Sequence, residues 1–398
     1  MRIIALACNN GAAMQTVVTA ERLWDGKTLH QRPILLIEDG KIDSIASRES
    51  AQLPANAKAL DFPGATLAPS FFDVHIHGAA GHDVMEATPQ ALETIGRFLA
   101  SRGTAVYLAT TVTASLDATL RSLDGLANEI AKLPEPGRAR PLGIHLEGPF
   151  LSHEKRGVQP AEHLLAPSTA TLDRMIDAGR GHVRLITIAP ELPGAEDLIR
   201  HAVSRGIRVS LGHSNATAAE TKSAIAAGAT SATHTFNAMR ALDHQEPGIL
   251  GTVLTTDELY SELICDGIHS KPAIVRLWWR SKGAERGILV TDAMSAAGMP
   301  DGEYKLGGFP VQVKDGRATA RGVLAGSVLT LDRALSNFVQ FTGATVEQGL
   351  GLLSSNPAHM TGLDHRAGSI APGRAANLVA VDAQGKLVAS LIAGQQVN

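Results

Sequence analysis

The sequence predicts an α/β fold: a closed (β/α)8 TIM barrel with a small β-sandwich domain formed by both chain termini. Eight apolar, β-rich segments alternate with amphipathic helical segments from about residue 65 onward. Alternating strands and helices indicate a parallel sheet, and eight such units complete one closed barrel. Short strand-like segments of similar texture precede and follow this region. We therefore expect a β domain at 14–64 plus 358–398, a barrel at 65–357, and a disordered extension at 1–13.

The composition narrows the function classes. The chain has 398 residues, of which 44% are hydrophobic but only 4% aromatic, so its core must be aliphatic. With 36 basic and 39 acidic residues, the net charge of −3 provides no basic surplus for nucleic acid or an anionic membrane. The two cysteines, Cys8 and Cys265, exclude a disulfide framework and argue against a cysteine-based zinc finger.

No membrane or export segment is evident. No window approaches the roughly 18 apolar residues of a membrane-spanning helix. The apolar run after Met1 is shorter than the roughly 7–15 residues of a signal-peptide core. We therefore expect a cytoplasmic protein. Met14 is an alternative to Met1 as the functional start.

The N-terminal region, residues 15–62, alternates short apolar runs with Asp-Gly turn signals, which is typical of antiparallel β structure. The eight expected barrel strands lie within residues 65–78, 104–112, 140–150, 183–190, 207–214, 230–236, 261–269 and 286–294. Helical segments between them lie at residues 88–103, 115–133, 195–206, 215–228 and 271–283.

The region after the eighth strand contains other elements. Residues 304–321 indicate a hairpin, two helices are expected around 329–341 and 345–356, and the tail at 366–397 is again β-like. An open doubly wound sheet of six to seven units is the competing architecture. No glycine-rich dinucleotide fingerprint follows the first strand, which favours the closed barrel.

Six of the predicted strands end in residues that can bind a metal or transfer a proton. These are Asp73, His75 and His77; His145 and Glu147; His213; His234; Asp266 and His269; and Asp292. Active sites of (β/α)8 barrels lie at the carboxyl ends of the strands. We therefore expect these side chains to meet on one face of the barrel.

Each of these residues also has a purely structural explanation. Glu147 could form a salt bridge with Lys155 or Arg156, and Asp292 could cap the following turn. His213 and His234 could be hydrogen-bonded core histidines, His269 a loop residue, and His75 with His77 a cap on the barrel core. A buried carboxylate is costly unless it is paired or binds a metal. One shared metal site explains all six strand ends, whereas the structural explanations require six independent causes for residues on the same face.

The chemistry of that set is hydrolytic. Two imidazoles and a carboxylate commonly hold zinc or another borderline divalent ion, and they leave room for a water molecule. The ion lowers the pKa of that water to about 7 and polarises a carbonyl. A neighbouring aspartate can accept the proton and pass it to the leaving group. No nucleophile elbow or P-loop competes for the site.

At this level of detail the chain resembles the amidohydrolase superfamily, and within it the N-acetylglucosamine-6-phosphate deacetylases. The matching stretches include PSFFDVHIHG, HLEGPF, LGHSNA, THTFNAM, EPGILG, CDGIH, LVTDAM and LAGSVLTLD, and they run from about residue 65 to the C-terminus. HLEGPF together with THTFNAM is specific to these deacetylases, whereas the His-x-His pair marks only the superfamily.

The resemblance implies a role for each matching residue. It implies a divalent metal, zinc with Fe, Co, Mn or Ni as alternatives, at one or two ions per subunit. Glu147, His213 and His234 would hold the principal ion, and His75 and His77 a second one bridged through Glu147. Asp292 would be the general base and later the acid. The residues Asn237, Ala238 and His269 would contact substrate. Family members are usually homodimers, so a loop near His244 would complete the neighbouring site.

Two positions depart from the family pattern. Where the family often has a histidine near the scissile carbonyl, this chain has Gln159, which can donate a hydrogen bond to the oxyanion but no proton. Where the family commonly has an arginine for the substrate phosphate, this chain has Gln245. His244 is then a candidate for holding the phosphate.

The sequence therefore predicts metal-dependent hydrolysis of N-acetylglucosamine 6-phosphate to glucosamine 6-phosphate and acetate, in amino-sugar catabolism. N-acetylgalactosamine 6-phosphate or an unphosphorylated acetamido sugar are alternative substrates. A cyclic amidase, aminoacylase or deaminase is a further alternative, but those relatives often have a carboxylated lysine or another histidine where Glu147 stands. A non-catalytic barrel is the third possibility, and the retained principal ligands argue against it.

Overall fold

The computed structural model describes residues 15–47, 57–132, 135 and 137–397. The expected extension at 1–13 and the choice between Met1 and Met14 lie outside these residues. Among the described residues, no helix is long and apolar enough to cross a membrane.

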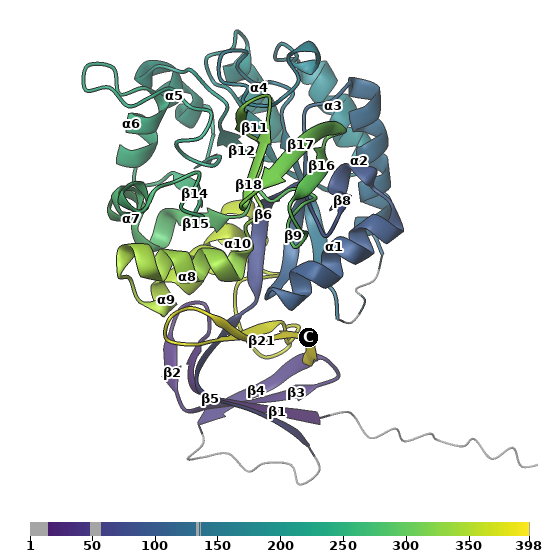
Figure 1. Cartoon of the computed structure of the whole chain (residues 1–398), viewed down its shortest axis with the longest axis vertical. Helices are drawn as coiled ribbons and strands as arrows, with labels where there is room; N and C mark the ends of the chain where they lie inside the picture. Colours follow the sequence, from purple (N-terminus) through teal and green to yellow (C-terminus); the bar gives the residue numbers. More distant parts are fainter. Residues whose placement is uncertain (1–14, 48–56, 133–134, 136, 398) are drawn as a thin grey trace, which may run out of the picture.

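Eight parallel strands form the barrel, in the order β15-β14-β13-β12-β11-β10-β9-β6 (Figure 1). Their bounds are β6 Phe71–Ile76, β9 Thr104–Thr111, β10 Arg140–Glu147, β11 Val183–Ile188, β12 Arg208–Leu211, β13 Ser231–Ala232, β14 Tyr260–Ile264 and β15 Gly287–Val290. Beyond β15, a parallel bridge between Ile76 and Ala293 brings the two edges of the sheet together. The predicted fold class is confirmed, and each of the eight expected segments overlaps one barrel strand.

Helices surround the barrel. They are α1 Pro89–Ser101, α2 Leu116–Ile130, α3 Thr169–Ala178, α4 Ala195–Ser204, α5 Ala218–Ala226, α6 Gly248–Thr255, α7 Pro272–Arg286, α8 Leu331–Thr342, α9 Val346–Leu353 and α10 Ser355–Thr361, with 3-10 turns at Val84–Glu86 and Ala161–His163. The sequence pattern did not reveal α3, α6 or α10. Helix α6 has no amphipathic signature because seven of its eight residues, Gly248 to Leu254, are buried.

Both chain ends contribute to a second sheet of eight strands, ordered β22-β21-β20-β5-β1-β3-β4, with β2 paired to β1. The strands are β1 Gln15–Trp24, β2 Leu29–Gln31, β3 Pro33–Glu38, β4 Lys41–Ser47, β5 Lys58–Pro69, β20 Leu378–Val381, β21 Leu387–Ile392 and β22 Gln395–Val397. Strand β5 leads into the start of β6, so this terminal sheet lies below the barrel in Figure 1. The carboxyl ends of the barrel strands therefore remain available for a site.

A smaller antiparallel sheet follows β15 and comprises β16 Gly302–Leu306, β17 Phe309–Lys314, β18 Arg317–Ala320 and β19 Val323–Leu324. The hairpin expected at 304–321 is part of it. Its apolar face packs on Val112 and Met294, which follow two barrel strands. The N–H of Gly307 also donates to Asp83 Oδ2 at 2.8 Å, where Asp83 ends the short ribbon of β7 Gly78–Ala79 and β8 His82–Asp83. This sheet therefore packs beside the carboxyl ends of the strands.

Candidate metal centre

The predicted metal ligands lie at or just beyond the carboxyl ends of their strands. Glu147 is the last residue of β10, while His213, His234 and Asp292 each follow the end of their strand by two residues. These last three residues have positive φ angles of 49°, 27° and 49°. Positive φ is uncommon for residues other than glycine and is often found where a functional site requires it. The backbone turns sharply here, and the side chains converge.

The first group of converging atoms surrounds one carboxylate oxygen. Glu147 Oε1 lies 3.0 Å from His213 Nε2 and 3.1 Å from His234 Nε2. The two imidazole nitrogens are themselves 3.1 Å apart. The salt bridge considered for Glu147, with Lys155 or Arg156, is not formed among the described residues, where its ion pairs are all with histidines. The Arg156 guanidinium donates to the carbonyl of Gln159 instead.

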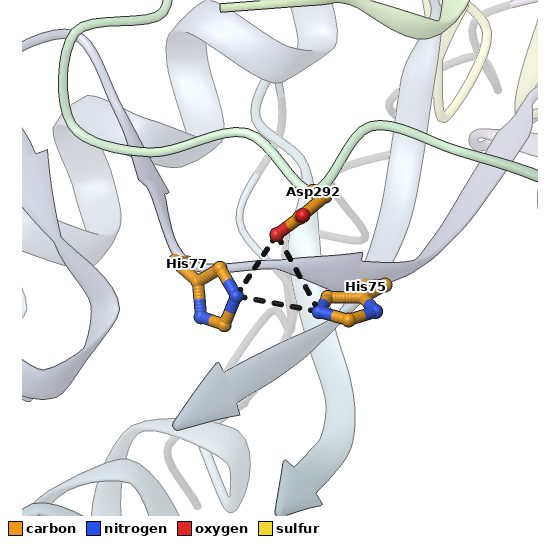
Figure 2. A group of neighbouring side chains, drawn as sticks. All are labelled: His75, His77 and Asp292. Atoms are coloured by element: carbon orange, nitrogen blue, oxygen red, sulfur yellow. Dashed lines mark hydrogen bonds and ion pairs between the residues drawn. The ribbon is translucent and has the colours of Figure 1, made fainter. Parts of the chain in front are cut away.

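The second group, drawn in Figure 2, joins the two histidines of the first strand to the end of the last strand. His77 Nε2 lies 3.1 Å and His75 Nε2 3.6 Å from Asp292 Oδ1. The two Nε2 atoms are 3.3 Å apart. His75 and His77 also lie 3.4 Å from Glu147, one at each carboxylate oxygen. Glu147 therefore contacts both groups.

The opposite ring nitrogens determine which atoms face the centre. Nδ1 of His213 lies 3.0 Å from the Lys155 carbonyl, and Nδ1 of His77 lies 3.0 Å from the Thr110 carbonyl. A carbonyl only accepts, so each Nδ1 carries a proton and each Nε2 faces the centre, where its lone pair is available to a cation once any proton on it is released. This second contact is the usual way in which a protein orients a metal-binding histidine.

Burial and mutual attraction shape the electrostatics of the centre. Burial alone would raise the pKa of Glu147, but the neighbouring His75 and His213 hold it well below its usual value. Burial opposes a charge on His77, yet its contacts with Asp292 and Glu147 raise its pKa to about 9. Two carboxylates and four imidazoles with convergent lone pairs fit a divalent cation, which would replace the protons that these groups share.

Two further buried carboxylates support this centre. Asp73 is among the strand-end residues expected from the sequence, whereas Glu262 was missed. Glu262, in the middle of β14, places Oε2 3.2 Å from His75 Nδ1 and has no solvent exposure. Asp73 accepts a 2.6 Å hydrogen bond from the Thr291 hydroxyl, and burial, opposed by that bond, raises its pKa to about 7. The argument that singled out Glu147, a carboxylate within an apolar strand, would also have found Glu262.

His145 has a different environment. Its Nδ1 faces the Val74 carbonyl at 3.2 Å, and its Nε2 lies 2.8 Å from the Thr187 hydroxyl. Burial, reinforced by the nearby His75, holds its pKa well below the ordinary value. His145 is therefore a neutral histidine that packs behind His75, with ring centroids 4.8 Å apart.

Comparisons with known proteins agree with this geometry. A model of the amidohydrolase family matches residues 66–397. The chain belongs to the amidohydrolase family. It is 40% identical over 354 residues to an N-acetylgalactosamine-6-phosphate deacetylase of Escherichia coli O157:H7, covering 87% of this chain and 93% of that protein. It is 38% identical over 347 residues to an N-acetylglucosamine-6-phosphate deacetylase of Lysinibacillus sphaericus, covering 87% and 88%.

A solved structure of a deacetylase also matches this chain. A mutant N-acetyl-D-glucosamine-6-phosphate deacetylase from Mycobacterium smegmatis, in complex with N-acetyl-D-glucosamine-6-phosphate, matches with a TM-score of 0.89 at 34% identity. The match covers 96% of this chain and 99% of that one. The resemblance seen in the motifs is thus confirmed. This amidohydrolase is a hydrolase of amide C–N bonds, and its His/Asp/Glu groups suit a metal-dependent family.

Gln159 lies directly against the centre of this amidohydrolase. Its Nε2 donates to Glu147 Oε2 at 2.7 Å, and its Oε1 accepts from the Thr113 N–H at 2.8 Å. These two bonds fix which end of the side-chain amide faces the carboxylate. A carboxamide has two N–H donors, so the second remains to serve another oxygen.

The residues expected to contact substrate lie in the loops that follow β13 and β14. Asn237 and Ala238 follow His234, and the Asn237 side chain donates to the His234 carbonyl at 3.3 Å. Ala238 has a φ of 50°, and its carbonyl accepts from the Ser214 N–H at 3.0 Å. His269 Nδ1 lies 2.6 Å from Asp266 Oδ2, which fixes the orientation of its ring.

The structure does not bring His244 and Gln245 to the metal centre of this chain. Both are exposed in the loop between β13 and α6, and the His244 side chain is 87% accessible. Asp243 organises the loop by accepting from the Gln245 N–H at 2.8 Å and the Glu246 N–H at 3.2 Å. This loop is therefore ordered by its own contacts while its two side chains point outward.

Proposed function

We propose that this amidohydrolase removes the acetyl group of N-acetylglucosamine 6-phosphate, giving glucosamine 6-phosphate and acetate in amino-sugar catabolism. The observation that carries this proposal is the position of Asp292, whose Oδ1 is 3.1 Å from His77 Nε2 in a centre that also contains Glu147. A carboxylate beside a cation site is the arrangement that amide hydrolysis requires. The names of the relatives, together with the sugar bound in the Mycobacterium smegmatis structure, support the substrate.

The ligand set defines where a divalent metal would bind. Glu147, His213 and His234 would hold the principal ion, and His75 and His77 a second ion that shares Glu147. One or two ions per subunit are thus compatible with the donors. Imidazole and carboxylate donors favour zinc, with Fe, Co, Mn or Ni as alternatives. When bound, the metal supplies a Lewis acid that polarises the acetyl carbonyl and lowers the pKa of water.

Asp292 moves the proton. Burial would raise the pKa of its carboxyl group, but the attraction of His75 and His77 holds that pKa below its usual value. The carboxylate is therefore ionised at neutral pH and can accept a proton from the attacking water as the new C–O bond forms. It then gives this proton to the amine nitrogen as the C–N bond breaks.

The surrounding residues position the substrate. We assign to the free N–H of Gln159 a hydrogen bond to the developing oxyanion, because its other N–H already binds Glu147. Asn237, Ala238 and His269 would contact the sugar from the loops after β13 and β14. Removal of the Asp266 partner of His269 would then weaken substrate binding more than the chemical step.

We infer a homodimer in which the loop carrying His244 and Gln245 completes the neighbouring site. The exposure of both side chains supports this, since they have no role at the centre of their own chain. The loop also lines a hollow of about 520 Å³ with Lys222 and Leu242. The phosphorylated substrate and the buried, unpaired Cys265 support a cytoplasmic location.

A second candidate reaction is the same deacetylation of N-acetylgalactosamine 6-phosphate. The 40% identical Escherichia coli O157:H7 relative, named for that substrate, favours it. Gln245 bears on phosphate recognition in both cases, because a carboxamide cannot form the bidentate, charge-assisted contact of an arginine. If Gln245 removes phosphate recognition altogether, the substrate would be an unphosphorylated acetamido sugar.

An acetate-release assay tests the function and the substrate together. The purified metal-loaded protein would be supplied with N-acetylglucosamine and N-acetylgalactosamine, each with and without a 6-phosphate. We expect the highest kcat/KM with N-acetylglucosamine 6-phosphate. A preference for the galactosamine epimer would select the second candidate, and equal rates without phosphate would show that Gln245 has removed phosphate recognition. No acetate from any of the four sugars would refute the proposal.

A further inference from the structure

A basic pocket of about 570 Å³ lies at the opposite end of the barrel from the metal centre. Arg184 and Arg208, which line it, are the second residue of β11 and the first residue of β12. Arg366 and His365, after α10, complete its polar lining. The metal ligands lie at the other ends of the strands, so this pocket shares no residue with the catalytic site.

The cations of this pocket have no counter-charges in the described part of the chain. Among the residues that the structure describes, no aspartate or glutamate lines the pocket, and no carboxylate is within ion-pair distance of Arg184, Arg208 or Arg366. By contrast, Arg97 and Arg180 each form an ion pair at 2.8 and 2.9 Å. The Nε of Arg184 is buried and has no hydrogen-bond partner among the described residues. A buried donor without a partner is costly and calls for an explanation.

Glycines lie beside two of these arginines, and one of them leaves space that a larger residue would fill. A Cβ at Gly143, on the neighbouring strand β10, would meet the Cγ of Arg184 at 2.4 Å. A Cβ at Gly362, beyond the end of α10, would lie 3.5 Å from a terminal nitrogen of Arg208. The two side chains therefore lie across glycines.

The arginines also repel one another. Burial lowers the pKa of Arg366, and the positive charge of Arg184 lowers it further. Arg140, at the start of β10, has its pKa lowered by burial and by Arg366. A guanidinium keeps its charge under such conditions, so the repulsion persists at all physiological pH values. A bound anion would relieve it.

We propose that this pocket binds a pyrophosphate group, either free or carried by a nucleotide. Guanidinium groups match phosphate oxygens with pairs of parallel hydrogen bonds. Three arginine charges exceed the charge of a single phosphate, whereas a diphosphate of about three negative charges balances them. The ligand is therefore of a different class from the monophosphate sugar at the metal centre, and the proposal does not depend on the proposed function.

Calorimetry on the metal-loaded enzyme tests this proposal. Sodium pyrophosphate would be titrated into protein saturated with glucosamine 6-phosphate, which occupies a catalytic site of the proposed kind. We expect one site in the wild type and an affinity at least tenfold lower in R184Q/R366Q. R97Q, which changes an ion-paired surface arginine, should bind like the wild type. Metal chelation by pyrophosphate contributes equally to all three titrations and cancels in the comparison.

Parallel arms identify the ligand and guard against misfolding. ADP binding as tightly as pyrophosphate would assign the group to a nucleotide, and weaker ADP binding would assign free pyrophosphate. The single variant R208Q, at an exposed position, should also weaken binding. We expect the unliganded variants to keep the wild-type Tm or exceed it, because like charges are removed. Unchanged pyrophosphate affinity in all variants, or equal affinity for inorganic phosphate, would overturn the proposal.

Discussion

The carboxylate of Asp292 is held beside His75 and His77 by a backbone turn with positive φ, directly after β15. Replacement by asparagine keeps the shape of the side chain but removes its proton-accepting capacity. We expect D292N to lower kcat by roughly a hundred- to ten-thousandfold, the range for loss of a general base. Metal content by mass spectrometry should stay near the wild-type value.

D117N, at an exposed position of α2, is the matched control for D292N and should be fully active. Near-normal turnover in D292N would refute the role assigned to this residue. Loss of metal together with loss of activity would instead show that Asp292 is chiefly a ligand.

Glu262 acts through another residue, and this gives a second prediction. Its carboxylate accepts from the Nδ1 of His75 at 3.2 Å, so it orients the ring whose Nε2 faces the centre. Loss of such a partner typically lowers metal affinity by roughly ten- to a hundredfold. We expect E262Q to lose one metal ion per subunit on dialysis while retaining the ion at Glu147, His213 and His234. E258Q, at an exposed position, controls for the charge change, and unaltered metal content in E262Q would contradict the prediction.

At the scale of elements, the segment 212–213 after β12 is closely packed between its neighbouring strands. A Cβ at Gly212 would meet Thr233 Cβ at 2.8 Å and Thr187 Cγ2 at 3.0 Å, from both neighbouring strands. We expect G212A to separate these strands, to cost roughly 1–3 kcal/mol of unfolding free energy by overpacking, and to weaken metal binding through His213. Urea unfolding measures the loss of unfolding free energy, and metal content after dialysis measures the loss of metal binding. G302A, where an added Cβ meets nothing closer than 3.5 Å, should leave stability unchanged; an equal loss in both would argue against the prediction.

Strands and strand ends could be predicted from the sequence, but buried helices and long-range contacts could not. The barrel strands could be predicted because apolar runs such as β9 and β10 lie between segments with helical periodicity. The residues near the ends of the predicted strands then included His75, Glu147 and Asp292. Helix α6 could not be predicted from amphipathic periodicity because it is buried on nearly every side. The contact between Glu262 and His75 joins residues 187 positions apart, and no local pattern records such a pair. The basic pocket likewise depends on two strands, β11 and β12, meeting a distant loop after α10 at one end of the barrel.

At the scale of the whole molecule, stability should respond to pH through Lys282 on α7. Its ammonium group donates to the carbonyls of Val253 and Thr256 at the end of α6, at 3.1 and 2.6 Å. Burial lowers its pKa to about 8 from an ordinary value of 10.5. Between these two values the folded chain has released a proton that the unfolded chain still binds. The free energy of unfolding therefore rises with pH across that interval.

Comparison with K282M isolates this contribution. We expect the unfolding free energy of the wild type, measured in urea, to rise relative to that of K282M between pH 8 and 10.5, and to show no such relative change between pH 6 and 7.5. The neutral amine still has two N–H donors for the two carbonyls, so the contacts with α6 survive deprotonation. K386M, at an exposed lysine, corrects for the removal of a charge. A difference between wild type and K282M that falls as the pH rises would mean that the folded state stabilises the charged form, and that α6 is held by an ammonium group.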